Sequence, residues 1–379
     1  MNSARTYLDH NATAPLRPEA RAAMLAALDV VGNPSSVHAE GRRARAIIED
    51  ARESVADLVG VSPAQVVFTS GATEANAWVL RAGWDAVFVA GIEHDSVLAP
   101  ARSAIPRVID VPVSDNGEIA VEGVQRAVEG DALSGAKRLI TLQLANNETG
   151  VVQPVAEVAA LASAAGIKVH TDAVQAAGRV PVDFAQLGVD TLSLSAHKLG
   201  GPKGVGALIL RDGFDPAPLV IGGGQERRRR AGTENVPGIA GFGAAAAAAK
   251  RDLAGMGRIA RLRDRLEREA VAAAPGAVVV GASGQRLANT TCLALPGLAA
   301  ETLVIRLDLA GVAVSAGAAC SSGKVGASSV LAAMGLPTEV ARSAIRVSLG
   351  WTSTEADVDA FLAAWVSIAG SYGRQRAVA

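Results

Sequence analysis

The alternation of apolar runs with amphipathic stretches between Val66 and Leu210 constrains the fold more than any other feature of the sequence. Strand–helix alternation at this spacing is typical of an α/β fold, in which helices cover both faces of a mainly parallel sheet. Ligands bind such sheets beyond the carboxyl ends of the strands. The expected strands are Val66–Thr69, Ala86–Ala90, Arg107–Val111, Arg138–Leu144, Lys168–Asp172, Thr191–Ser195 and Val205–Leu210, and the expected helices include Thr73–Ala82, Val121–Val128 and Pro154–Ala165.

The character of the chain changes after Leu210. A loop rich in Gly and Arg, Ile221–Gly232, leads into an Ala-rich helical stretch from about Pro237 to Ala274, with a break expected near Gly255 and Gly257. A length of 379 residues accommodates two domains, so we expect the remainder to form a smaller α+β domain. Its expected strands are Ala277–Val280, Thr290–Leu295, Val312–Val314 and Ile345–Ser348, and its expected helices are Glu301–Leu309 and Thr354–Ile368.

Charge and composition exclude several classes of partner. The 36 Lys and Arg residues nearly balance 37 Asp and Glu residues, so no overall field attracts nucleic acid or an anionic membrane. No uncharged apolar run approaches the ~20 residues of a membrane span, and Met1–Pro15 lacks the apolar core of a signal peptide. We therefore expect a cytoplasmic protein whose partner is a small molecule or another protein.

The cysteines and histidines do not favour a metal site. Neither Cys292 nor Cys320 has a CxxC partner, and two cysteines make no disulfide framework. No pair among the five histidines has HxH or i, i+4 spacing. We expect Cys292, inside an apolar run, to be a core residue, and Cys320, among small residues, to lie on a mobile loop.

Polar clusters follow several of the expected strands. Thr69–Asn76 contains a glycine and hydroxyl groups at the expected start of a helix, which suits either a phosphate site or an ordinary helix cap. Asp172 ends a strand, where its carboxylate can pair with a cationic ring nitrogen or cap the next helix. His94 also follows a strand, at a position suited to proton transfer or ring stacking.

A lysine also lies in such a cluster. The chain has six lysines against thirty arginines, and two of the lysines, Lys198 and Lys203, fall in one Gly-rich segment after a strand. Lysine can form an imine, which arginine cannot, although a solvated lysine is the usual alternative. The arginine run Arg227–Arg230 lacks the interleaved aromatic residues of a nucleic-acid site and is interpreted as a local anion site or a solvated loop.

Together these clusters are the parts that hold pyridoxal phosphate, and here the sequence resembles a known family. It is similar to the cysteine desulfurases of the class V aminotransferase group, within the fold-type I pyridoxal-phosphate enzymes, from Tyr7 to about Trp365. The matching motifs are Tyr7–Pro15, Gly32–Ser36, Thr69–Asn76, Glu93-His94, Ala145–Gly150, His170–Gln175, Ser195–Lys198 with Gly201–Gly204, Arg230–Pro237 and the loop through Cys320.

The resemblance implies a role for each residue around the cofactor ring. Lys198 binds pyridoxal 5'-phosphate covalently and carries protons, and Asp172 pairs with the ring nitrogen. Gln175 bonds to the ring hydroxyl, and His94 stacks on the ring and transfers protons. The implied phosphate ligands are Ala72, Thr73, Ser195 and His197, together with Thr233 from a neighbouring subunit, so the resemblance also implies a homodimer.

The resemblance further implies the reaction and its partners. Asn147, which also contacts the cofactor, and Arg346 hold the carboxylate of L-cysteine. The thiolate of Cys320 removes the sulfur, leaving L-alanine and a persulfide on Cys320. The sulfur passes to an acceptor or an iron–sulfur scaffold protein, whose cluster Cys320 could contact transiently. The segment after Cys320 resembles the long-loop group that serves iron–sulfur assembly or nitrogen fixation.

The resemblance also implies a domain division. A large cofactor-binding domain with a seven-stranded sheet spans residues 15–250, and a small domain spans residues 1–14 and 251–379. The small domain carries the loop of the catalytic cysteine at about 315–330.

Alternative functions on the same scaffold are a selenocysteine lyase and a class V aminotransferase, because fold and cofactor do not fix the reaction. A transaminase has no need of Cys320. A non-catalytic sulfur carrier or scaffold partner is a third alternative, which the presence of Lys198, Asp172, His94 and Cys320 argues against.

Overall fold

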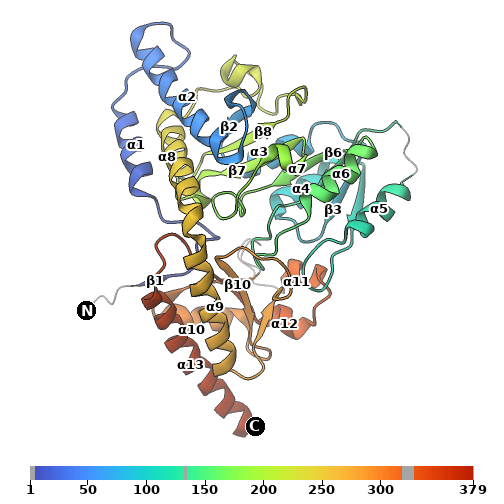
Figure 1. Cartoon of the computed structure of the whole chain (residues 1–379), viewed down its shortest axis with the longest axis vertical. Helices are drawn as coiled ribbons and strands as arrows, with labels where there is room; N and C mark the ends of the chain where they lie inside the picture. The colour runs from blue at the N-terminus through green and yellow to red at the C-terminus, as the bar shows by residue number, and fades with distance from the viewer. Residues whose placement is uncertain (1–4, 132–134, 318–327, 379) are drawn as a thin grey trace.

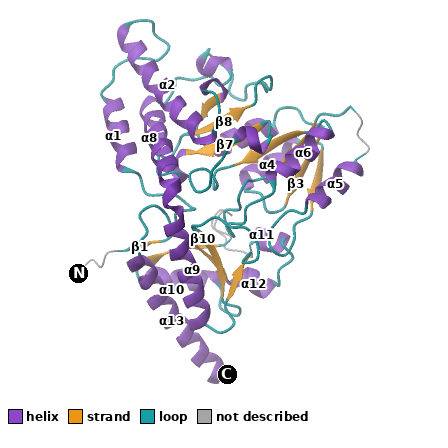
Figure 2. Ribbon diagram, viewed as in Figure 1, coloured by secondary structure: helices purple, strands orange, loops and turns teal. Residues whose placement is uncertain are grey.

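A seven-stranded sheet forms the centre of the larger part of the molecule (Figures 1 and 2). The computed structural model describes residues 5–131, 135–317 and 328–378. The strand order is β2-β8-β7-β6-β5-β3-β4, and only β8 runs antiparallel to its neighbours, so the α/β fold with a mainly parallel sheet is confirmed. The strands are β2 (Val66–Thr69), β3 (Ala86–Ala90), β4 (Arg107–Val111), β5 (Arg138–Thr141), β6 (Lys168–Asp172), β7 (Thr191–Ser195) and β8 (Gly206–Leu210).

Helices cover both faces of this sheet, so its inner strands are buried along nearly their whole length. In β3, Val87 and Val89 belong to one apolar cluster, while Phe88 and Ala90 belong to another on the opposite face. Helices α3 and α4 pack on the first face, and α2, α6 and α8 pack on the second. The helices of this part are α1 (Pro18–Leu28), α2 (Ala39–Val59), α3 (Ala72–Leu80), α4 (Asp95–Ala104), α5 (Val121–Glu129), α6 (Val155–Ala164), α7 (Phe184–Leu187) and α8 (Val236–Asp252).

A long helical run connects the large sheet to the second part of the molecule (Figure 1). Helix α8 continues through a 3-10 turn at Leu253–Gly255 into α9 (Met256–Ala273), which confirms the break expected near Gly255. Beside α9 lies a four-stranded antiparallel sheet of order β12-β13-β10-β9, with a two-stranded sheet of β1 and β11. These strands are β1 (Thr6–Tyr7), β9 (Val278–Val280), β10 (Thr290–Ala294), β11 (Val312–Ala313), β12 (Ser315–Ala316) and β13 (Ala344–Ser348).

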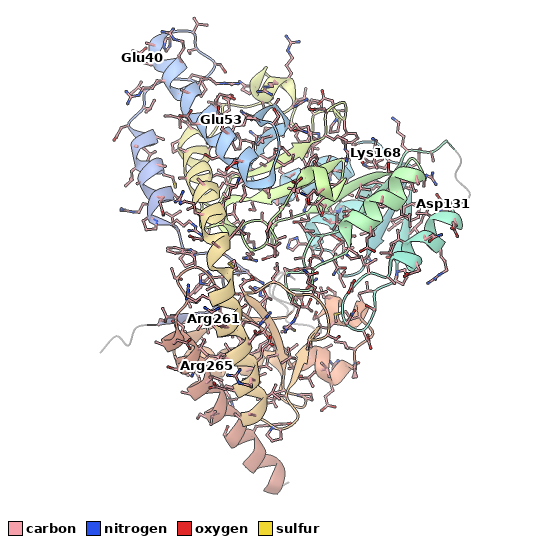
Figure 3. The ribbon with its side chains drawn as sticks, in the orientation of Figure 1. Glu40, Glu53, Asp131, Lys168, Arg261 and Arg265 are labelled. Carbon is pink, nitrogen blue, oxygen red and sulfur yellow. The ribbon has the colours of Figure 1, made fainter. Side chains whose placement is uncertain are left out.

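The second part has its own apolar cluster, which includes Leu266 of α9, Leu303 of α10 and Trp365 of α13. Arg265 of α9, labelled in Figure 3, binds α13 through Glu355 at 2.7 Å and Asp359 at 2.6 Å. The remaining helices are α10 (Ala300–Leu309), α11 (Ser329–Ala333), α12 (Thr338–Ser343) and α13 (Glu355–Val378). Among the described residues, no helix combines the length and apolar composition of a bilayer span.

Helices α1 and α2 lie outside the part of the sequence for which the alternation predicts elements. Helix α2 is amphipathic, and its side chains Ile48 and Val55 face the core. It begins after His38, whose ring accepts a hydrogen bond from Gly41 N, and ends at Gly60, where φ is +69° and glycine is favoured. The division into domains at residues 15–250 stays a prediction.

Candidate active site

A cavity of about 530 Å³ lies at the edge of the large sheet where strands β2, β3, β5, β6 and β7 end. These strands share one direction, so the segments that follow them converge at this edge. Nine residues singled out in the sequence line the cavity, namely Ala72, Thr73, His94, Asn147, Asp172, Gln175, Ser195, His197 and Lys198.

The start of helix α3 forms one wall of the cavity. Its N-cap residue, Gly71, has no side chain to accept from the first amides of the helix, so these amides suit an anion. A close approach of strand β8 shapes this turn, since a Cβ on Gly206 would lie 2.7 Å from Gly71 Cα. Glu74, in the first turn, accepts from Ser70 N at 2.8 Å and from Arg230 Nε at 2.9 Å, which ties the turn to Arg230.

Asp172 ends strand β6 with its carboxylate in the cavity wall and is 7% exposed. Its Oδ1 accepts from Val174 N at 2.9 Å, and its Oδ2 accepts from Asn76 Nδ2 at 2.8 Å. Asn76 Oδ1 faces His170 Nε2 at 3.0 Å, so the His170 nitrogen is the donor. Burial lowers the pKa of His170 to about 4, and the neutral ring and the amide hold the Asp172 carboxylate in place.

Lys198 follows strand β7 and donates its Nζ to the backbone oxygens of Asn11 and Ala12, the latter at 2.9 Å. The neighbouring His197 has its Nδ1 3.2 Å from Thr13 Oγ1. Burial, together with Lys198 and Lys203, lowers the pKa of His197 to about 4, so the ring is neutral at pH 7. Neutral imidazole beside two lysines suits an anionic ligand.

His94 is the N-cap of helix α4, and its Nδ1 accepts from Ser96 N at 3.0 Å. A backbone amide can only donate, so the neutral ring carries its proton on Nε2. The preceding Glu93 is 3% exposed and accepts from Gln143 N, while its Oε2 has no hydrogen-bond partner among the described residues. Burial raises the pKa of Glu93 to about 8.

Two of the predicted residues, Arg346 and Thr233, do not line this cavity in the described chain. Arg346, on β13, donates Nη1 to Asn147 O at 3.2 Å and Nη2 to Asp9 Oδ1 at 2.9 Å. It therefore lies directly behind a residue of the cavity wall. Thr233 is exposed and lines a neighbouring cavity, which shares Ser70 with the first.

The two cysteines differ in what the structure says of them. Cys320 lies outside the described residues, so the predicted role of its thiol stays a prediction. Cys292 is fully buried on β10, and burial raises the pKa of its thiol. It is a core residue, as the sequence predicts.

Sequence reasoning gave no role to several residues that the structure brings to the site. Asn76 lies inside the motif Thr69–Asn76, but its role becomes visible only in its hydrogen bond to Asp172. The one sign of that role in the sequence is an asparagine between apolar residues of a helix, and the structure shows this residue to be buried. Gln143 lines the cavity, and Asn11 O accepts from both Lys198 and Gln175. Arg179 contacts Gln175 from behind the cavity wall. Apart from the contact of Arg179 with Gln175, four residues away, these hydrogen bonds join segments far apart in the sequence.

The cavity combines an anion site, a buried carboxylate and a lysine. The uncapped amides of α3 suit a phosphate, Asp172 suits a protonated ring nitrogen, and Lys198 suits a carbonyl carbon. The donor set therefore fits pyridoxal 5'-phosphate and supports proton transfer at a carbon beside an amino group.

Comparisons with known proteins agree over nearly the whole chain. A cysteine desulfurase from Cereibacter sphaeroides is 44% identical over 371 residues, which cover 94% of each chain. The structure of a NifS-like protein from Rickettsia africae has a TM-score of 0.89 at 35% identity, covering 96% of this chain and 99% of that one. SspA in complex with cysteine has a TM-score of 0.76 at 28% identity, covering 91% and 98%. The model of the family described as "Aminotransferase class-V" matches residues 6–361. The chain therefore belongs to this family.

Proposed function

We propose that this protein is a cysteine desulfurase, which converts L-cysteine to L-alanine and leaves the sulfur as a persulfide on Cys320. The observation that carries the proposal is the meeting of Asp172, Lys198, His94 and the uncapped start of α3 in one cavity. The similarity to cysteine desulfurases over 94% of the chain supports it.

The cofactor is pyridoxal 5'-phosphate, which supplies the electron sink for loss of the substrate Cα proton. Asp172 keeps a proton on the ring nitrogen, and Asn76 and Val174 N fix the two oxygens of that carboxylate. Gln175 donates to the ring hydroxyl oxygen. The proposed phosphate ligands are Ala72, Thr73, Ser195 and His197.

Proton transfer falls to Lys198 and His94. Lys198 Nζ, which donates to Asn11 O and Ala12 O, takes the Cα proton and returns it to the product. His94 keeps its proton on Nε2 because Ser96 N occupies Nδ1, so the Nε2 proton is the one that it would donate in the cavity.

Substrate orientation depends on Arg346 and Asn147. A guanidinium binds a carboxylate with two parallel hydrogen bonds, and Arg346 Nε has no partner within the described part of the chain. Arg346 Nη2 donates to the Asp9 carboxylate in this structure. When the substrate binds, its carboxylate takes the place of Asp9 at this atom.

Sulfur transfer is assigned to Cys320. Its thiolate attacks the γ-sulfur of the bound substrate, a sulfur–sulfur bond forms and the carbon–sulfur bond breaks. The electron pair of that bond returns to Cβ, which takes up a proton, and alanine is released. The deeply buried Cys292, whose thiol pKa is raised, is unsuited to the step.

We further propose a homodimer, with Thr233 of each subunit reaching the phosphate of the other. Thr233 is exposed and beside the cavity wall at Ser70. Helix α1 and the segment after it expose large apolar side chains, since Leu28, Val31 and Val37 are 64%, 81% and 88% exposed. Such apolar side chains support a protein contact.

The proposed setting is the cytoplasm, where a sulfur acceptor or an iron–sulfur scaffold protein receives the persulfide sulfur. The proposed domains are a large cofactor-binding domain of residues 15–250 and a small domain of residues 1–14 and 251–379. Limited proteolysis would test the division, with first cleavage expected at the exposed 3-10 turn Leu253–Gly255 between α8 and α9.

Mass spectrometry tests the reaction assignment. After incubation with L-cysteine, a peptide containing Cys320 gains the mass of one sulfur atom, and the same peptide from Cys320→Ala does not. Sulfur found on Cys292 would reverse the assignment of the two cysteines. Cys292→Ala is the matched control and keeps the transfer.

A further inference from the structure

Arg179 is a buried cation behind the cavity wall whose contacts are all oxygens of uncharged groups. It lies in the turns after β6 and is 9% exposed. Its Nη1 donates to Gln175 O at 3.0 Å and also to Gln175 Oε1, and its Nη2 lies 3.5 Å from His10 O. Among the described residues, no carboxylate forms an ion pair with it, so the Gln175 side chain is its principal side-chain partner.

This contact fixes the orientation of the Gln175 amide. A guanidinium has only donors, so the amide atom that faces Arg179 must be the oxygen. The amide nitrogen then faces away from Arg179, and Nε2 donates one hydrogen to Asn11 O at 3.1 Å. Because Gln175 also lines the cavity, its second amide hydrogen is the one that can point at a ligand there.

The titratable groups around Arg179 either repel it or are neutral at pH 7. Its hydrogen bond with the Gln175 side chain is therefore its main stabilising contact. Arg346 repels it, and burial lowers its pKa to about 9, still well above neutrality. His10, which faces Asp357, and His197 are neutral at pH 7, because burial lowers the pKa of each to about 4.

The other two nearby cations have partners of their own. Arg17 is paired with Asp252 at 2.7 Å. Lys198 donates to Asn11 O, the same oxygen that Gln175 uses, so the amide and the lysine are held by one acceptor.

We propose that Arg179 is a positioning residue that locks the Gln175 amide with its N–H toward the ring oxygen of the cofactor. The inference rests on the proposed function in assigning Gln175 to that oxygen. A locked donor stabilises the ionised ring oxygen. Without Arg179 the amide can turn over or rotate away, and the ring oxygen then holds a proton more tightly.

A pH titration of the cofactor's visible absorbance tests the proposal. In Arg179→Met the midpoint rises by about one pH unit, and the affinity of the apoprotein for pyridoxal phosphate falls about tenfold. Arg179→Lys keeps a cationic donor and stays near the wild-type midpoint. Arg17→Met, which removes a buried cation that does not touch Gln175, is the matched control and leaves the midpoint unchanged.

A double-mutant cycle separates positioning from a merely structural role. Gln175→Ala raises the midpoint, and adding Arg179→Met to it gives little further change. A full additional shift, or no shift in Arg179→Met alone, overturns the inference. No shift in Gln175→Ala means instead that the proposed assignment of Gln175 is wrong.

Gln175→Glu covers the case in which Arg179→Met does not fold. The glutamate still satisfies Arg179 but has no N–H, so the midpoint rises as in Gln175→Ala. An unchanged midpoint in Gln175→Glu, as in Gln175→Ala, means that the assignment of Gln175 to the ring oxygen is wrong, and the inference about Arg179 falls with it. Circular dichroism of each apoprotein shows whether it is folded.

Discussion

Arg52 and Glu226 form a buried ion pair that holds helix α2 against the loop before Thr233. Their side chains are each 2% exposed, and two hydrogen bonds of 2.8 and 2.7 Å join them. Glu226 Oε2 also accepts from Phe68 N on β2, at 2.8 Å. We predict that Arg52→Met causes a large loss of stability.

The magnitude follows from the charge left behind. Without Arg52, the Glu226 carboxylate stays buried with the Phe68 amide as its remaining donor, and breaking such a pair costs about 3–5 kcal/mol. That is a large share of the ~5–15 kcal/mol by which folded domains are stable. Adding Glu226→Gln removes the stranded charge and keeps an acceptor for Phe68 N, so the double variant regains about 2 kcal/mol.

Equilibrium urea denaturation at one protein concentration measures these differences. Arg43→Met is the matched control on the same helix, because Arg43 is exposed and takes part in no ion pair of the described residues. We expect it to cost no more than about 1 kcal/mol. A loss below about 1 kcal/mol for Arg52→Met, or a double variant no more stable than the single one, would refute the reasoning.

Three further predictions concern the site. Gly206→Ala places a Cβ 2.6 Å from Leu194 O and 2.7 Å from Gly71, so the turn at the start of α3 must shift. Titration of the apoprotein with pyridoxal phosphate should show at least about tenfold weaker binding, and an unchanged affinity would contradict this prediction. Burial raises the Glu93 pKa from 4.5 to about 8, so the folded state binds this proton more tightly and stability falls as pH rises between these values. In urea denaturation, Glu93→Gln removes this fall, worth about 3 kcal/mol between pH 4.5 and 7, and a slope equal to the wild type would argue against a neutral Glu93. Lys198→Ala abolishes both the visible band of the covalently bound cofactor and alanine release, and surviving alanine release would show that another group moves the proton.

Much of the large sheet could be predicted because several of its strands, such as β2, β3 and β8, are short apolar runs. Strands β3 and β6 have the expected bounds, Ala86–Ala90 and Lys168–Asp172. The strand order and the antiparallel direction of β8 could not be predicted, because pairing joins segments far apart in the chain. Helix α13 runs past the expected end at Ile368 to Val378, because Gly370 and Gly373 are tolerated inside the helix and do not end it.

The site divides in the same way between local and long-range features. Asp172 and Lys198 follow strands, so their place at the sheet edge could be predicted from local pattern. The contacts of Asn76 with Asp172 and of Arg179 with His10 O cross 96 and 169 positions of sequence. No periodicity reports such contacts, and the fold had to be known before they could be seen.

Alanine formation from L-cysteine tests the central claim most directly. The purified protein, loaded with cofactor and supplied with a reductant, is assayed beside Cys320→Ala. We predict alanine from the wild type and none from the variant, whose visible cofactor band stays intact. Equal alanine from both proteins would show that Cys320 does not remove the sulfur, and none from either, with the cofactor band present, would contradict the assignment as a cysteine desulfurase.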